Sequence, residues 1–250
     1  MFDHRQFAAA LESVSSVPAE PIALTSTDAE ADALACHGGE FARYGDPRRQ
    51  IFDAMIETVA QRGYDRTTIE RVTGAAQVPA PVFDEHFEDK QECFLHSLDR
   101  LFGRVEQVLL ARMRWPMPWP ERIQLGLRTL LVELAEHPDS ARVAMVECLS
   151  AGEESVARLR AALAQLVAIL DEGRAYAAEE GSPGIEYLPP QISVAIVGGI
   201  AAIVHRQVLE ERTAELPLLL GELLYFALLP YLGHDRALCA SGLDAAASAD

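Results

Sequence analysis

The sequence predicts an all-α protein, with a small N-terminal three-helix unit followed by a larger C-terminal helical bundle. From Pro47 onward, apolar residues recur three and four positions apart, which is the period of amphipathic helices. No run alternates apolar and polar residues as a half-buried strand would, and no segment repeats. Gly and Pro punctuate the periodic runs, most clearly in "RWPMPWP" at Arg114–Pro120.

Composition and charge limit the class of protein. Half of the 250 residues are hydrophobic, so the chain can bury a sizeable core and is not globally disordered. The net charge of −17 argues against a nucleic-acid-binding protein unless the basic groups are local. Nearly all of the basic residues are Arg, and Lys90 is the only lysine.

The cysteines and the apolar runs predict neither metal binding nor membrane insertion. Cys36, Cys93, Cys148 and Cys239 form no CxxC pair, and Cys93-x-x-His96 has no matching second pair, so we expect free thiols and no metal or cofactor. The apolar runs at Ile192–Val204 and Leu216–Gly233 fit buried or interface helices better than membrane spans. Asp3, His4 and Arg5 stand where an export signal would be apolar, so we expect a cytoplasmic protein.

Residues 1–46 are predicted to be a flexible N-terminal extension. After a possible short amphipathic helix they are rich in small, polar and acidic residues and poor in large apolar ones. The alternative is an arm that covers a ligand or binds a partner, which composition alone does not decide.

Residues 47–100 are predicted to form three short helices and the start of a longer one. The first helix runs from Pro47 to a C-cap at Gly63, and Thr67 or Thr68 caps the second. Pro79 suits the first turn of the third helix, and Glu88 or Asp89 begins the long helix that follows. Two of these helices joined by a tight turn make a helix-turn-helix, here at about residues 68–87.

Residues 101–233 are predicted to form the larger bundle. Its later helices, in order, are expected at Glu121–Glu136, Ser140–Ser150, Glu153–Ala178, Pro190–Glu211 and Leu216–Leu232. The remaining residues, 234–250, are predicted to be a frayed tail because the apolar pattern fades there.

One set of residues keeps a recognisable spacing: Gly63-Tyr64, Thr67-Thr68, Ala75-Ala76, Val78, His86-Phe87 and Lys90. With this pattern the chain resembles the TetR/AcrR family of bacterial transcription regulators over most of its length, from Arg48 to about Leu232. The resemblance implies that the third helix enters the DNA major groove and that a homodimer reads a palindromic operator. It also implies that the C-terminal helices enclose a small-molecule pocket, and that ligand binding moves the two reading heads out of register.

The resemblance and the positions of the basic groups predict a set of DNA-contacting residues. His86 and Lys90 match phosphate-contact positions of the family, while Ala80 and Val82 stand where bases are read and can meet thymine methyl groups. The hydroxyl of Thr68 and the two guanidinium groups next to the start of the first helix are further candidates for the phosphate backbone. The expected DNA-binding residues are Arg48, Arg49, Thr68, Ala80, Val82, His86 and Lys90.

The charge of the same segment opposes DNA binding. No Arg or Lys lies between Ala75 and Asp89, whereas Asp84, Glu85, Glu88 and Asp89 are acidic. From Asp46 to Arg100 there are seven basic and eleven acidic residues. Any DNA binding is therefore expected to be weak or strongly salt-dependent.

The C-terminal helices supply candidates for dimerisation and for a pocket. Small residues that let two helices approach, together with apolar residues of the last helix, predict a four-helix dimer interface, with packing inside one chain as the alternative. Its expected members are Gly198, Gly199, Ala202, Leu219, Leu223 and Phe226. A small apolar or amphipathic ligand is expected in a pocket, with His205 or Glu147 as polar anchors if buried. The expected lining residues, each also compatible with plain core, are Met145, Cys148, Leu149, Leu166, Leu170 and Tyr176.

Two functions remain open at the level of the sequence. The first is a ligand-responsive homodimeric transcriptional regulator, expected to be a repressor. The alternative is a helical dimer of the same ancestry that has lost DNA binding and acts as a small-molecule sensor or protein partner. An enzyme is not expected, because the sequence offers no nucleophile–base–acid set, Gly-rich phosphate loop or paired metal motif.

Overall fold

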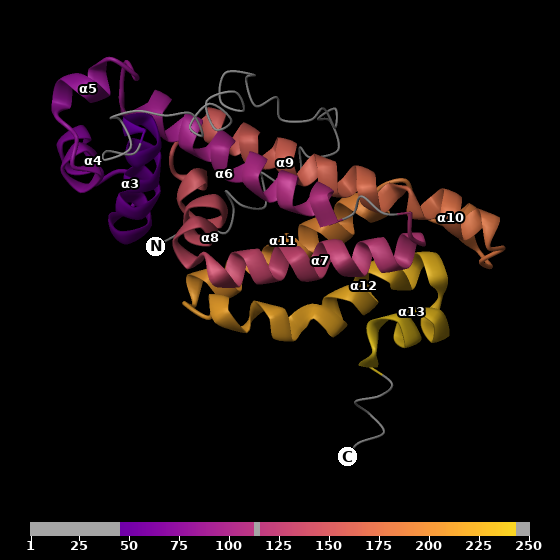
Figure 1. Ribbon diagram of the computed structural model, residues 1–250. Helices are drawn as coiled ribbons and strands as arrows, with labels where there is room; N and C mark the ends of the chain where they lie inside the picture. The colour runs from indigo at the N-terminus through magenta and orange to yellow at the C-terminus, as the bar shows by residue number, and fades with distance from the viewer. Residues whose placement is uncertain (1–45, 113–115, 244–250) are drawn as a thin grey trace. The chain divides into compact units, whose positions relative to one another are not determined.

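The computed structural model describes residues 46–112 and 116–243 (Figure 1). Over these residues the chain is helical, with short 3-10 turns and no strand, which confirms the predicted all-α class. The described residues divide into two compact units. We call residues 46–104 and 139–159 the head unit, and residues 105–112, 116–138 and 160–243 the body unit. The expectation for the N-terminal extension falls almost wholly on residues outside the described part.

The first helices of the head unit begin and end where local signals predict. Helix α3 (Pro47–Arg62) has Asp46 at its N-cap, where the carboxylate accepts the backbone N–H of Arg48 at 3.1 Å. It ends at Gly63, whose φ of +84° is accessible to glycine without strain. Helix α4 (Ile69–Ala76) begins after Thr68, but the Thr68 side chain makes no capping hydrogen bond. The hydroxyl of Thr67 donates instead to the carbonyl of Gly63 at 2.9 Å.

Helices α5 (Ala80–Asp84) and α6 (Lys90–Arg112) follow, and aromatic side chains join them to α3. Phe87 lies between the rings of Phe83 and Phe52, with ring centroids 5.3 and 5.5 Å away. The ring of Tyr64 packs on Phe94 of α6 at 4.8 Å. Phe83 and Phe94 are fully buried, so these contacts form the head core.

Residues 139–159 belong to the head unit although they follow the first helix of the bundle in sequence. They include nearly all of α8 (Pro138–Met145), the 3-10 turn η3 (Glu147–Leu149) and the first part of α9 (Glu153–Asp171). Arg158 of α9 donates to Asp99 of α6 at 2.7 Å. The head unit is therefore not the continuous segment 47–100 that the sequence predicts, because a later segment packs into it.

The body unit contains α7 (Trp119–Glu136), α10 (Gly173–Glu179), η4 (Ile185–Tyr187), α11 (Ile192–Leu209), η5 (Thr213–Leu219), α12 (Leu220–Leu232) and α13 (His234–Ser241). Trp119 is central to its core. The indole N–H donates to the carbonyl of Ile169 at 3.1 Å, and the ring meets that of Tyr231 at 5.0 Å. In turn, the hydroxyl of Tyr231 lies 2.7 Å from that of Ser193 on α11.

Two predicted elements of this unit are wrong. The helix expected over Glu153–Ala178 is broken at Glu172 into α9 and α10. Gly173 lies under the Trp119 indole, where an added Cβ would come within 2.3 Å of the ring. The tail expected to fray from residue 234 instead forms α13 as far as Ser241, which packs against α12 and buries Ala237 completely.

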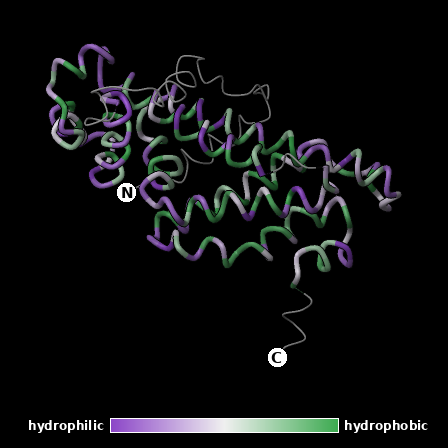
Figure 2. Tube along the Cα trace, viewed as in Figure 1, coloured by the Kyte–Doolittle hydropathy of each residue, from purple (hydrophilic) through white to green (hydrophobic). Residues whose placement is uncertain are grey.

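Helices α11 and α12 are the most apolar part of the body unit, and Figure 2 shows them largely in green. By length and composition, Ile192–Leu209 and Thr213–Leu232 would each be able to cross a membrane, a test that core helices of soluble proteins also pass. Only 44% and 39% of these segments are buried within the protomer. Some of their apolar residues, among them Ala202 and Phe226, are exposed on the protomer.

Candidate DNA-binding surface of the head unit

Helices α4 and α5, with the turn between them, form a helix-turn-helix. Helix α4 ends at Ala76, and Gln77 takes the left-handed conformation with a φ of +57°. The N–H of Val78 donates to the carbonyl of Thr73 at 3.0 Å, and Pro79 then precedes the five residues of α5. This turn brings α5 back against α4, and Figure 1 shows α3, α4 and α5 grouped together.

Helix α5 has a buried side and an exposed side. Phe83 and Phe87 anchor it to the head core and are 0% and 2% exposed. The side chains of Ala80, Asp84 and His86 are exposed, and that of Val82 is half-buried. The residues predicted to read bases thus lie on a surface that is partly or fully open to solvent.

The predicted phosphate-binding residues are in different environments. Thr68 and Arg49 are exposed, and the Arg49 guanidinium approaches Asp53 at 4.0 Å. The guanidinium of Arg48 is half-buried, 5.4 Å from the centroid of the Phe52 ring. Lys90 is also half-buried, and its ammonium donates to the carbonyl oxygen of Tyr64 at 3.0 Å.

The four acidic residues after the turn are all exposed, but they do not have the same role. Asp89 precedes α6 and its carboxylate accepts the N–H of Glu92 at 2.8 Å, as an N-cap does. The N–H of Glu88 in turn donates to the Glu92 carboxylate. Asp84 and Glu85 stand at the end of α5, on the side of the helix that is open to solvent. The negative charge expected from the sequence is therefore present on this surface.

Glu147 is a buried carboxylate that contacts the turn between α3 and α4. It is 2% exposed, and its Oε2 accepts the backbone N–H of Tyr64 at 3.2 Å. Burial raises the pKa of Glu147, while the Tyr64 N–H and the Arg142 guanidinium act in the opposite direction. Glu147 was expected, if buried, to anchor a ligand. Its partner is instead Tyr64, a link between distant positions that no local pattern of the sequence indicates.

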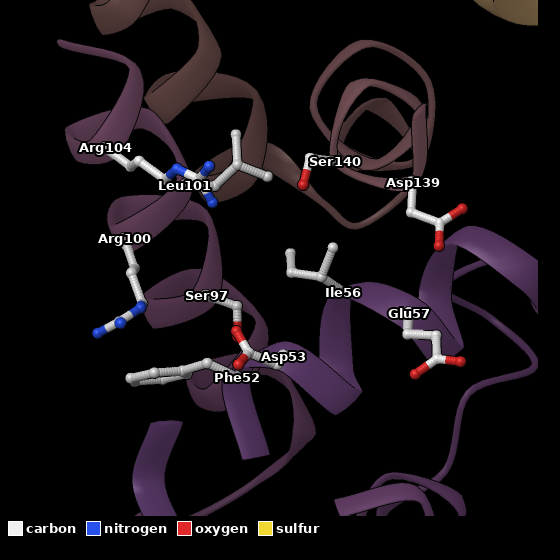
Figure 3. Close-up of a pocket in the computed structure, with 10 residues that line it drawn as sticks. All are labelled: Phe52, Asp53, Ile56, Glu57, Ser97, Arg100, Leu101, Arg104, Asp139 and Ser140. Carbon is white, nitrogen blue, oxygen red and sulfur yellow. The ribbon is translucent and has the colours of Figure 1, made fainter. Parts of the chain in front are cut away.

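The head unit also has an open pocket of about 280 Å³ between α3, α6 and the start of α8 (Figure 3). Arg100 and Arg104 lie on one side, and Glu57 and Asp139 lie on the other. Phe52, Ile56 and Leu101 contribute the apolar part of the lining. None of the residues predicted to line a ligand pocket borders it.

The predicted ligand-pocket residues are divided between the two units. Met145, Cys148 and Leu149 are buried in the head unit, where Cys148 donates to the carbonyl of Ala144 at 2.7 Å and burial raises the pKa of its thiol. In the body unit, Leu170 and His205 are buried, and Leu166 and Tyr176 are half-buried. Sequence reasoning missed Thr129 and Gln207, whose buried side-chain oxygens have no hydrogen-bond partner among the described residues.

The predicted dimer residues are mostly accessible. Ala202 and Phe226 are exposed, and Gly198, Gly199 and Leu219 are partly exposed. The Phe226 ring lies over Gly199, where an added Cβ would come within 3.2 Å of it. Leu223 is only 3% exposed and belongs to the core of the protomer.

Comparisons with known proteins agree with this geometry. Residues 51–96 match the bacterial regulatory proteins of the tetR family. No curated protein sequence matches the chain closely enough to count as a relative. Among solved structures, the fatty acid degradation regulator FadR from Bacillus halodurans is similar, with a TM-score of 0.64 and 20% identity over 75% of this chain and 95% of that one.

Two further solved structures share the fold. FadR from Bacillus subtilis, in complex with stearoyl-CoA, has a TM-score of 0.59 and 18% identity over 74% of this chain and 98% of that one. SmeT, the repressor of the Stenotrophomonas maltophilia multidrug efflux pump SmeDEF, has a TM-score of 0.61 and 16% identity over 76% and 92%. The match and the head geometry identify residues 51–96 as a helix-turn-helix segment of the kind found in bacterial regulatory proteins of the tetR family.

Proposed function

We propose that the protein is a ligand-responsive homodimeric repressor that binds a palindromic operator through α4 and α5. The observation that carries this proposal is the two-sided placement of α5. Phe83 and Phe87 fix its inner side to the head core, while Ala80, Val82 and His86 lie on the side open to solvent. A short helix held in this way is presented to a groove as a rigid element.

The proposed contacts divide into positioning and reading. Arg49, Thr68 and His86 are exposed and supply the donors that meet phosphates, and the half-buried Arg48 and Lys90 are further candidates. Ala80 and Val82 offer only apolar contacts, which suit thymine methyl groups. The operator is accordingly expected to contain A·T pairs under α5 in each half-site.

Homodimerisation is supported by the apolar surface of α11 and α12. Fewer than half of the residues in either segment are buried within the protomer. A two-fold axis would place the same helices of two protomers against each other and cover this surface. Ala202 and Phe226 are exposed and central to the proposed interface.

The ligand is proposed to be a small amphipathic molecule bound in the body unit. Thr129 and Gln207 keep buried oxygens without a hydrogen-bond partner among the described residues, and such atoms are suited to a bound molecule. Because FadR from Bacillus subtilis was solved with stearoyl-CoA, a long-chain acyl-CoA is the first probe to try. Its binding is expected to weaken DNA binding, and DNA to weaken ligand binding by the same factor.

The second candidate is a TetR-like dimer without DNA binding that works as a cytoplasmic sensor or protein partner. The observation in its favour is the exposed negative charge of Asp84, Glu85 and Glu88 beside α5. Carboxylates at such positions repel phosphates and reduce the gain from counterion release. Neither proposal requires catalysis.

Selection from a random DNA library with the purified full-length protein tests the proposal. We expect enrichment of an inverted repeat whose half-sites lie about one helical turn apart. Enrichment of a single half-site would contradict the dimeric arrangement. A library that remains random at low salt would favour the sensor.

A further inference from the structure

We propose that Glu147 is a positioning residue for DNA binding, which holds the turn before the helix-turn-helix through Tyr64 and thereby holds Lys90. This inference rests on the proposed function of the head. Glu147 lies outside residues 51–96, the segment that matches the family. The family match therefore says nothing about a part for Glu147 in DNA binding. All of the residues involved belong to the head unit.

The carboxylate is held in place from two directions. Its Oε2 accepts the N–H of Tyr64 at 3.2 Å, and its Oε1 lies 3.5 Å from the Nε of Arg142 on α8. Gly63 leaves the space for this approach, since a Cβ at that position would lie only 3.3 Å from Oε2. A buried acceptor with these two partners fixes where the turn after α3 can lie.

Tyr64 passes this constraint on to Lys90. Its peptide N–H is bonded to Glu147, and its carbonyl oxygen accepts from the Lys90 ammonium at 3.0 Å. The same ammonium lies 4.0 Å from the centroid of the Tyr64 ring, which itself packs on Phe94 of α6. One residue thus connects η3, the turn before α4 and the first residue of α6, which brackets the helix-turn-helix on both sides.

Packing alone does not account for a carboxylate at this position. An isolated buried charge loses its hydration, and a well-packed apolar side chain of similar size is often as stable or more stable. An apolar side chain would, however, leave the Tyr64 N–H without an acceptor. The chemistry that Glu147 supplies is a fixed acceptor, and this is what a positioning residue needs.

Whether removal of Glu147 raises or lowers DNA affinity distinguishes a positioning role from an effect of its charge. If only charge mattered, removal of any carboxylate from the head would tighten DNA binding, because the repulsion from phosphates falls. If Glu147 positions Tyr64, its removal weakens DNA binding despite the lost negative charge. A glutamine keeps an oxygen acceptor without the charge, and should therefore restore the affinity.

Three variants of the full-length protein test this. Glu147→Met keeps the volume and removes the acceptor, and Glu147→Gln keeps the acceptor. Asp65→Asn is the matched control, because Asp65 follows Tyr64 and is exposed. Circular dichroism first establishes that each variant is folded. The DNA probes are overlapping duplexes that cover the region directly upstream of the protein's own gene, measured by fluorescence anisotropy.

We expect Glu147→Met to bind the best duplex about tenfold more weakly than wild type, and Glu147→Gln to bind within about threefold of it. Asp65→Asn should bind as tightly as wild type or more tightly. A Glu147→Met protein that binds as tightly as wild type, or a Glu147→Gln protein as weak as Glu147→Met, overturns the inference.

Amide hydrogen exchange without DNA distinguishes failure of the inference from failure of the proposed function. The peptide that contains Tyr64 should exchange faster in Glu147→Met than in wild type and be protected again in Glu147→Gln. Unchanged exchange in Glu147→Met overturns the role of Glu147 whether or not DNA is bound. If wild type binds no duplex but the exchange differs as expected, the proposed function fails while the link from Glu147 to Tyr64 stands.

Discussion

The ammonium of Lys90 lies 3.0 Å from the carbonyl oxygen of Tyr64 and 4.0 Å from the centroid of the same residue's ring. The only lysine of the chain is thus engaged within the head unit as well as being a candidate for phosphate contact. A hydrogen bond and a cation–π contact to one residue fix the start of α6 relative to the turn before α4.

Replacing Lys90 with Met should destabilise the protein by about 1 kcal/mol, because the hydrogen bond and the cation–π contact are lost while the alkyl stem is kept. The estimate is small because Lys90 is only half-buried and water screens its charge. Urea unfolding followed by circular dichroism measures the difference. Gln91→Met, at the exposed neighbouring position, is the control and should change stability little. An equal loss of stability in both variants would mean that the contacts of Lys90 with Tyr64 do not stabilise the protein.

Gly173→Ala should destabilise the body unit by about 1–3 kcal/mol through overpacking. The added methyl group would stand within 2.3 Å of the Trp119 ring, which is itself held by the Ile169 carbonyl and the Tyr231 ring. Gly74→Ala is the matched control. It lies in α4 with nothing within 4 Å of the added Cβ, so it should stabilise the helix by about 0.5–1 kcal/mol. Thermal unfolding of the two variants should shift in opposite directions, and a loss of stability in Gly74→Ala or none in Gly173→Ala would contradict the packing.

Glu147 should make stability depend on pH in a defined direction. Burial raises its native pKa above the ordinary 4.5, against the opposing effects of the Tyr64 N–H and Arg142, and Asp65 adds to the rise. The native state therefore holds the proton to a higher pH than the unfolded state. The contribution of Glu147 to wild-type stability falls as pH rises from the unfolded pKa to the native one, and is level above it.

The Glu147→Gln variant lacks this titration and provides the reference. Its free energy of unfolding minus that of wild type should increase as pH rises through the window and then stay constant. Urea unfolding of both proteins at a series of pH values gives the difference and cancels the titration of the other groups. A difference that decreases with rising pH would mean that the native pKa of Glu147 is lowered.

Phe226→Arg should convert the proposed homodimer to a monomer. Phe226 is 43% exposed on α12, and a guanidinium there would be buried unpaired in a two-fold interface. Leu110→Arg is the control, because Leu110 is 56% exposed on α6, away from α11 and α12 in sequence. Light scattering after size exclusion measures the mass of each. If the Phe226→Arg protein is still a dimer, the dimer interface does not include Phe226.

The order of the helices and the helix-turn-helix were predictable because their signals are local. Pro47, Gly63 and Pro79 act on the residues next to them, and Phe83 and Phe87 are one helical turn apart. The break at Glu172 was not predictable, because it accompanies the distant Trp119 indole lying over Gly173. The link from Glu147 to Tyr64 joins residues 83 apart, and no periodicity marks such a pair.

The central claim is that the head still binds DNA despite its exposed carboxylates. Fluorescence anisotropy with duplexes from directly upstream of the protein's own gene, compared with scrambled duplexes at low and at moderate salt, tests it most directly. We predict selective binding at low salt that weakens steeply as salt rises, since binding releases counterions from the phosphates. Equal affinity for the upstream and scrambled duplexes at both salt concentrations, or no binding to either, would contradict it.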